Sequence, residues 1–60
     1  MIEHSEWIEL HDAFNDIVLI RRSAVVAISK DMTGNTIVNC GSYRVSVLES
    51  FNRVVMEVIE

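Results

Sequence analysis

The chain has 60 residues and a formal net charge of −4, and half of its residues are apolar. This length allows one domain, residues 1–60, and a domain of this size buries only about 60% of its unfolded surface. A single cysteine, Cys40, excludes an intrachain disulfide, and one cysteine with two histidines argues against a structural zinc site. Self-association is the remaining way to stabilise so small a domain, and the surplus of apolar residues favours it.

Charge and hydropathy also limit the location and the partners. Nine acidic residues against five basic ones argue against nucleic acid as a partner, because such binding depends on neutralised phosphates. Residues 1–6 lack the basic start and apolar core of a signal peptide. No apolar run is long enough to span a bilayer, and one free thiol fits a reducing compartment. The sequence therefore predicts a cytoplasmic protein without a membrane span.

The first half of the chain predicts a flexible arm and two strands joined by a turn. Residues 1–5 form the arm. Alternation over Trp7–His11 predicts a strand with Ile8 and Leu10 on one face. The segment DAFND at residues 12–16 is typical of a turn, because Asp and Asn bind their own backbone. Phe14 in this turn either folds back on the sheet edge or anchors a partner.

The apolar run Ile17–Ile20 predicts a second strand. Four consecutive apolar residues imply burial on both faces, or burial on one face together with an interface on the other. Polar residues 21–23 interrupt the apolar pattern, and Ala24–Ser29 is expected to form the third strand.

The second half predicts two more strands. Residues 30–35 form a polar loop in which Gly34 supplies a positive φ. Thr36–Asn39 is the fourth strand, and a tight turn around Gly41 leads into the fifth, which runs from Tyr43 to Val47 or Leu48.

The last ten residues predict an amphipathic helix over residues 50–59. Ser50 is a suitable N-cap, since its hydroxyl can accept from the amide of Asn52 or Arg53. The apolar residues after it fall at helical spacing on one face: Phe51, Val54, Val55, Val58 and Ile59. The expected class is α+β, a small antiparallel β-meander of four to five strands with one C-terminal amphipathic helix.

The order of these signals resembles a family of very small bacterial and phage proteins, which includes short flagellar-operon proteins linked to swarming motility. The opening strand and the segment after it match at Ile8, Leu10, Ile20, Val25 and Ile28. The hairpin matches at Thr36, Val38, Gly41, Tyr43 and Val45, and the helix start matches at Glu49, Ser50, Phe51 and Val54. The resemblance implies a fold and no catalytic residues.

Catalytic and metal-binding constellations are weak in this sequence. Cys40 with His4 or His11 could act as nucleophile and base, but the cysteine falls in a predicted turn. His4, Glu6, His11 and Asp12 lack the spacing of known metal sites, and a solvated polar face explains them better. We therefore expect no enzyme activity, no metal and no cofactor.

Three arginines are the candidates for binding an anion. In an oligomer, Arg21, Arg22 and Arg44 from different chains could converge on a phosphate or carboxylate. Trp7, Tyr43 or Phe14 could supply a stacking surface for a nucleotide. Alternatively, these arginines pair with the excess of carboxylates across the interface.

The predicted function is that of a small non-enzymatic, homo-oligomeric regulatory protein that acts through protein–protein contacts. A phage-encoded inhibitor of a host system is one form of this function. The expected interface residues are Trp7, Phe14, Val18, Val26 and Met56. The alternative is a phage-type sponge that binds a small nucleotide signal at a subunit interface.

Overall fold

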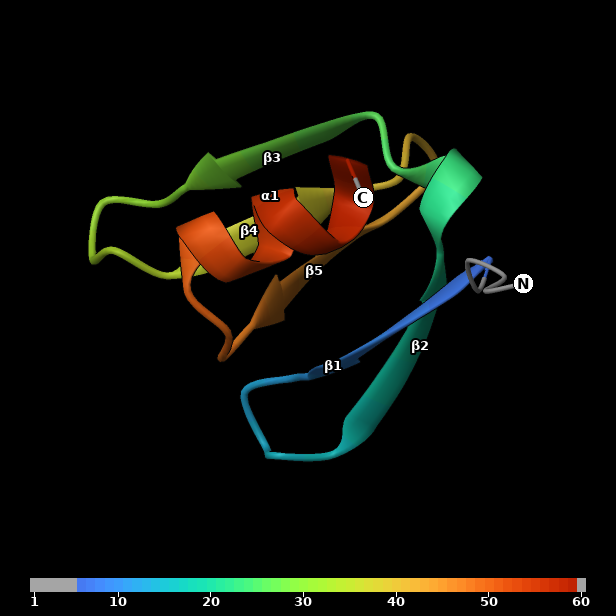
Figure 1. Cartoon of the computed structure of the whole chain (residues 1–60). Coiled ribbons are helices and arrows are strands. Elements are labelled where there is room, and N and C mark those ends of the chain that lie inside the picture. Colours follow the sequence, from blue (N-terminus) through green and yellow to red (C-terminus); the bar gives the residue numbers. More distant parts are fainter. Residues whose placement is uncertain (1–5, 60) are drawn as a thin grey trace.

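The computed structural model of the protein describes residues 6–59, so the expected arm at residues 1–5 lies outside the described residues. The fold contains two sheets and one α-helix (Figure 1). The helix lies across the larger sheet, and the smaller sheet, a β-hairpin, lies beside the larger one. In chain order the elements are β1 (Trp7–His11), β2 (Ile17–Arg21), the 3-10 helix η1 (Arg22–Ala24), β3 (Ala27–Lys30), β4 (Thr36–Asn39), β5 (Arg44–Val47) and α1 (Phe51–Ile59).

The strands form two antiparallel sheets, one containing β1 and β2 and the other with the order β3-β4-β5. The predicted α+β class, the antiparallel pairing of sequential strands and the C-terminal helix are confirmed. The meander is interrupted between β2 and β3, where the chain leaves one sheet and enters the other.

The interruption also corrects the bounds of the third strand. It was expected at Ala24–Ser29, but β3 begins at Ala27 because η1 occupies the residues after β2. The amide of Val25 donates to the carbonyl of Arg22 at 3.2 Å and closes the helical turn. The amide of Val26 then donates to the carbonyl of Asn39 at 2.7 Å, which brings the chain to β4.

The two sheets meet where β1 ends. Asp12 forms an antiparallel bridge with Val47, and the amide of Leu48 donates to the carbonyl of His11 at 2.8 Å. The end of β1 is therefore bonded to the end of β5, which orients the hairpin against the larger sheet (Figure 1).

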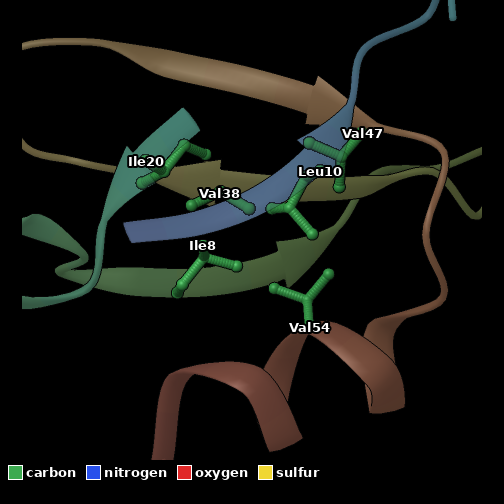
Figure 2. Packing of buried hydrophobic residues seen from close by; sticks show 6 residues of the cluster. All are labelled: Ile8, Leu10, Ile20, Val38, Val47 and Val54. Carbon is green, nitrogen blue, oxygen red and sulfur yellow. The ribbon is translucent and has the colours of Figure 1, made fainter. Parts of the chain in front are cut away.

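One small core lies between the hairpin, the larger sheet and the helix. Its buried side chains point toward one another from β1, β2, β4, β5 and α1 (Figure 2). Burial of such a side chain stabilises a fold by about 1.5–3 kcal/mol, so a core of this size gives limited stability. The buried apolar residues are Ile8, Leu10, Ile20, Val38, Val47 and Val54.

The helix begins as the sequence predicts. The hydroxyl of Ser50 accepts a hydrogen bond from the amide of Arg53 at 3.2 Å, which is the N-cap contact. Val54 is fully buried and Val58 packs against the core, whereas Ile59 at the end of the predicted apolar face is exposed. The helix therefore contacts the core mainly through its middle.

The β1–β2 turn (DAFND) and the β3–β4 turn (DMTGN) have the same construction. In each, the carboxylate of the first residue, Asp12 or Asp31, accepts hydrogen bonds from two backbone amides of the turn. The fourth residue has a positive φ, 67° at Asn15 and 91° at Gly34. Both turns are therefore fixed by a local side chain and hold the registers of their hairpins.

Candidate interaction surface

The outward side of the β1–β2 hairpin carries side chains that the fold leaves exposed. Residues directly opposite each other in an antiparallel pair project from the same side, so the register decides which residues share it. We call the six outward residues the hairpin face: Trp7 opposite Arg21, Glu9 opposite Leu19, and His11 opposite Ile17. The alternate residues of both strands lie on the core side.

Three apolar side chains of the hairpin face are open to solvent. Ile17 is 61% exposed, Leu19 is 57% exposed and Trp7 is 48% exposed. The guanidinium of Arg21 lies 4.9 Å from the centre of the Trp7 ring, a cation–π contact that holds the arginine at one end of the face. A second, weaker contact joins Arg21 to Glu6, with 3.8 Å between Nη1 and Oε1.

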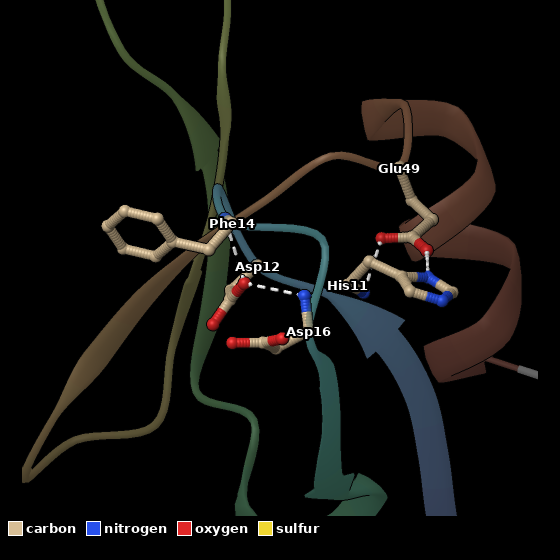
Figure 3. A network of polar contacts seen from close by, with 5 residues as sticks. All are labelled: His11, Asp12, Phe14, Asp16 and Glu49. Atoms are coloured by element: carbon tan, nitrogen blue, oxygen red, sulfur yellow. Dashed lines mark hydrogen bonds and ion pairs between the residues drawn. The ribbon is translucent and has the colours of Figure 1, made fainter.

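Phe14 projects from the tip of the same hairpin. Its side chain is 85% exposed, which contradicts the alternative in which it folds back on the sheet edge. Asp12 fixes the backbone beneath it by accepting from the amide of Phe14 at 2.9 Å. Figure 3 shows the ring pointing away from the carboxylates of Asp12 and Asp16. Its role as an anchor for a partner stays a prediction.

Glu49 binds His11, which lies at the end of the hairpin face nearest the β1–β2 turn. One carboxylate oxygen accepts from the backbone amide of His11 at 3.0 Å, and the other lies 2.7 Å from Nδ1 of the ring (Figure 3). A carboxylate only accepts, so the ring donates from Nδ1. The side chain of Glu49 is 8% exposed. The contact between His11 and Glu49 therefore connects the hairpin to the segment between β5 and α1.

The pKa of Glu49 reflects this contact. Burial raises the pKa, but hydrogen bonds from the His11 side chain and backbone lower it by more, so the pKa lies below its ordinary value of 4.5. The ionised form is therefore the one that the fold stabilises.

A cavity of about 200 Å³ lies between the β3–β4 turn and the start of α1. Lys30 lines it, and its Nζ lies 5.7 Å from the centre of the Phe51 ring. Two of its other polar side chains are already engaged, because Ser50 caps the helix and Glu49 holds His11. We therefore assign no ligand to this cavity.

The four residues expected to bind an anion lie on separate elements: Arg21 at the end of β2, Arg22 in η1, Tyr43 in the β4–β5 turn and Arg44 at the start of β5. None of them lines the cavity beside α1. Arg21 already contacts Trp7, and the Nε atom of Arg22 is buried without a hydrogen-bond partner among the described residues. Their convergence between different chains stays a prediction.

The remaining interface candidates are spread over the molecule. Val26, which precedes β3, is 71% exposed, and Met56 on α1 is 53% exposed. Val18 is half-buried and packs against the core. The outward apolar residues of β2 are therefore Ile17 and Leu19, and a role of Val18 in an interface stays a prediction.

The sequence did not identify Ile17 and Leu19 as outward residues, because four consecutive apolar residues do not show which of them face the core. The turn determines this through the strand register. Its first residue, Asp12, and its positive-φ residue, Asn15, fix a register in which Leu10 lies opposite Val18 on the core side, so Ile17 and Leu19 face outward. The signal for an outward apolar pair was the unbroken run itself. Glu49 was named only as part of the helix start, and its contact with His11 was missed because the two residues are far apart in the chain.

Other chemistry has little support in the described part of the chain. Within residues 6–59, no group of three or more His, Cys, Asp or Glu side chains is placed to hold a metal ion. His4, considered above as a ligand and as a base, lies outside these residues. Cys40 is half-buried beside Tyr43, and its hydrogen bond, its charge and some burial raise the pKa of Tyr43. None of the helices in residues 6–59 is long and apolar enough to cross a membrane.

Comparisons with known proteins add no relative. No family model, no curated protein and no solved structure matches the chain.

Proposed function

We propose that this protein is a small, non-enzymatic, homo-oligomeric interaction protein that regulates a partner through protein–protein contacts in the cytoplasm. The observation that carries the proposal is the hairpin face, where Trp7, Ile17 and Leu19 are exposed on one side of two paired strands. Clustered exposed apolar and aromatic side chains are typical of protein contact sites.

The small core supports the same proposal. Small domains with little buried apolar surface usually gain stability from a disulfide, a metal or a partner. A disulfide within the chain is impossible with Cys40 alone. A partner that covers the hairpin face would bury apolar surface that the isolated chain leaves in water.

The resemblance to the flagellar-operon proteins contributes to the choice of biological setting. A bacterial or phage protein that inhibits a host system would act through surface contacts of this kind. Several positions that carry the resemblance, such as Ile8, Leu10 and Val38, are core residues in this fold. The resemblance thus supports a shared architecture more strongly than a role in motility.

Native mass spectrometry of protein purified gently from its host tests the proposal. It reports the number of subunits and any retained small molecule together. An oligomer without additional mass is the expected result. A monomer at micromolar concentration would contradict the proposal.

A second candidate is a sponge that binds a small anionic nucleotide at a subunit interface. The observation that favours it is the buried, unpartnered Nε of Arg22 among the described residues, since a guanidinium is well suited to bind phosphate. An oligomer that retains a few hundred daltons would support this alternative. Arg22→Ala, Arg21→Ala and Arg44→Ala should then each release the bound mass, and retention by all three would reject it.

A further inference from the structure

We propose that the hairpin face binds the hairpin face of a second copy of this chain around a two-fold axis. This inference rests on the proposed function and specifies the surface that forms the oligomer. The β1–β2 outward side is the contact, and the exposed apolar residues on other elements lie outside it.

The exposed area is of the right order for a small dimer interface. A fully buried aromatic side chain accounts for about 150–250 Å², so half-exposed side chains contribute on the order of 100 Å² each. Trp7, Ile17 and Leu19 together give roughly 300 Å² per copy, and the exposed side chains of Glu9, Arg21 and Phe14 enlarge this area. A standard interface buries about 800 Å² per partner. An interface below the standard size is typical of weak association, so we expect a dissociation constant in the micromolar range.

The charges on the hairpin face favour a second copy as the occupant. A two-fold interface places the same patch on both sides, so the patch must complement itself. The hairpin face contains one carboxylate, Glu9, and one guanidinium, Arg21, on different strands and different rows. The hairpin face therefore contains both partners of an ion pair. A two-fold rotation can bring the guanidinium of each copy to the carboxylate of the other copy.

The position of Glu9 selects one direction of the axis. Glu9 and Leu19 form the middle row of the face. An axis across the strands would place Glu9 on Glu9 of the mate, which is repulsive. An axis along the strands instead places β2 of one copy over β1 of the other, with each Glu9 facing a Leu19 and each Arg21 above a Trp7. Arg21 then reaches the neighbouring Glu9, one row away, across sheets about 10 Å apart.

Arg21 has the capacity for this second contact. Its guanidinium carries five N–H donors, and its ion pair with Glu6 is long, at 3.8 Å, with both side chains more than half exposed. The ring of Trp7 beneath it limits its motion. The dimer therefore needs little reorganisation of the hairpin face, and each Arg21–Glu9 pair lies beside the apolar side chains of the face.

Trp7 gives a direct optical readout, because it is the only tryptophan in the chain. Sedimentation velocity and tryptophan emission should be recorded on the full chain over the same dilution series. The expected result is a shift of the emission to shorter wavelength as concentration rises, with a midpoint that coincides with the change from monomer to dimer mass.

A matched pair of leucines tests the surface. Leu19 is 57% exposed on the hairpin face, and Leu48 is 58% exposed in the segment between β5 and α1. Leu19→Glu places a carboxylate in the middle row of the hairpin face, where it meets Glu9 of the mate in the proposed orientation, so charge repulsion replaces the contact of an apolar side chain. Leu19→Glu should weaken dimerisation by at least about tenfold, whereas Leu48→Glu should leave it unchanged. Circular dichroism of both variants checks that they fold.

Exchange of the charges tests the orientation. Glu9→Arg and Arg21→Glu should each weaken the dimer, and the double variant should recover most of the wild-type dissociation constant.

The outcomes separate this inference from the proposed function. A dimer that survives Leu19→Glu, or one that Leu48→Glu dissociates, overturns the hairpin face as the contact and leaves the homo-oligomer in place. A wild-type chain that stays monomeric throughout the micromolar range overturns both. A dimer that Leu19→Glu dissociates, but that the double charge exchange does not restore, overturns the axis along the strands.

Discussion

The outward sides of the two sheets have opposite character, although their inward sides share one core. Outward residues of the β3-β4-β5 sheet are mostly small or polar, with Ile37 placed between Ser29 and Ser46. Outward residues of the β1–β2 hairpin include Trp7 and Leu19, which lie about half in solvent. In the larger sheet, most apolar residues face the core and small or polar residues face outward. The hairpin, in contrast, has apolar residues on both sides, and those on its outward side are not buried by the fold. Trp7, Ile17 and Leu19 share one side of the hairpin, whereas exposed apolar residues such as Val26 and Met56 lie singly on other elements, and this locates the expected contact.

The largest expected effect separates the two sides of the hairpin. Leu10 is 1% exposed, and Leu10→Ala should lower the free energy of unfolding by about 2–5 kcal/mol, because it leaves a cavity in a small core. Ile17→Ala, on the outward side of the same hairpin, should change it by less than about 0.5 kcal/mol at concentrations where the chain is monomeric. Urea unfolding followed by circular dichroism measures both. Equal losses would show that the outward side is packed within the monomer.

The second largest effect concerns the joint between the sheets. Glu49→Gln removes the charge that His11 binds from its ring and backbone. We expect a loss of about 1–2 kcal/mol at neutral pH, since a charged hydrogen bond is replaced by a weaker neutral one. Glu57→Gln on α1 removes the same charge outside this contact and is the matched control.

The pH dependence of that loss has a defined sign. The folded pKa of Glu49 lies below its ordinary value of 4.5, so its stabilisation is complete above that value and is lost as pH falls through the folded pKa. The difference in unfolding free energy between wild type and Glu49→Gln should therefore be constant near neutrality and shrink below pH 4.5. A difference that stays constant into acid would show that the carboxylate is not held by His11.

The periodicity of apolar residues predicted most of the helix and strands, because these elements depend mainly on residues that are close in the sequence. The strand Trp7–His11, the fourth strand and the helix cap at Ser50 depend on alternation and on one hydroxyl, both visible in the sequence. The division into two sheets was not visible. It depends on the short 3-10 helix η1 and on the β-bridge between Asp12 and Val47, which connects the ends of strands far apart in the chain.

The candidate site was predicted in part for the same reason. Trp7 and Phe14 stand out by residue type, and both are exposed. In β2 every residue from Ile17 to Ile20 is apolar, so type alone cannot tell the inward Val18 from the outward Leu19. Only the register set by the turn makes that distinction, because a shift of one residue exchanges the two sides of a strand.

The turns provide the next prediction, of smaller size. Gly34 has a φ of 91°, and a Cβ there would meet no atom within 4 Å, so any cost of substitution is conformational. Gly34→Ala should reduce the free energy of unfolding by about 1–2 kcal/mol, the usual cost of a left-handed alanine. Gly34→Asn should cost less, because the equivalent position of the other turn is occupied by Asn15. Thermal unfolding of both variants measures this, and equal costs would contradict the conformational explanation.

Asn15→Gly is the reciprocal change and should have the smallest effect. Asn15 already adopts a φ of 67°, a conformation that asparagine tolerates better than most residues. Glycine would relieve the remaining strain but add freedom to the unfolded chain, and these contributions oppose each other. We expect a change of only a few tenths of a kcal/mol in unfolding free energy and an unchanged dimer dissociation constant. A weaker dimer at unchanged stability would mean that Asn15 sets the shape of the tip, and would extend the contact from the hairpin face to Phe14.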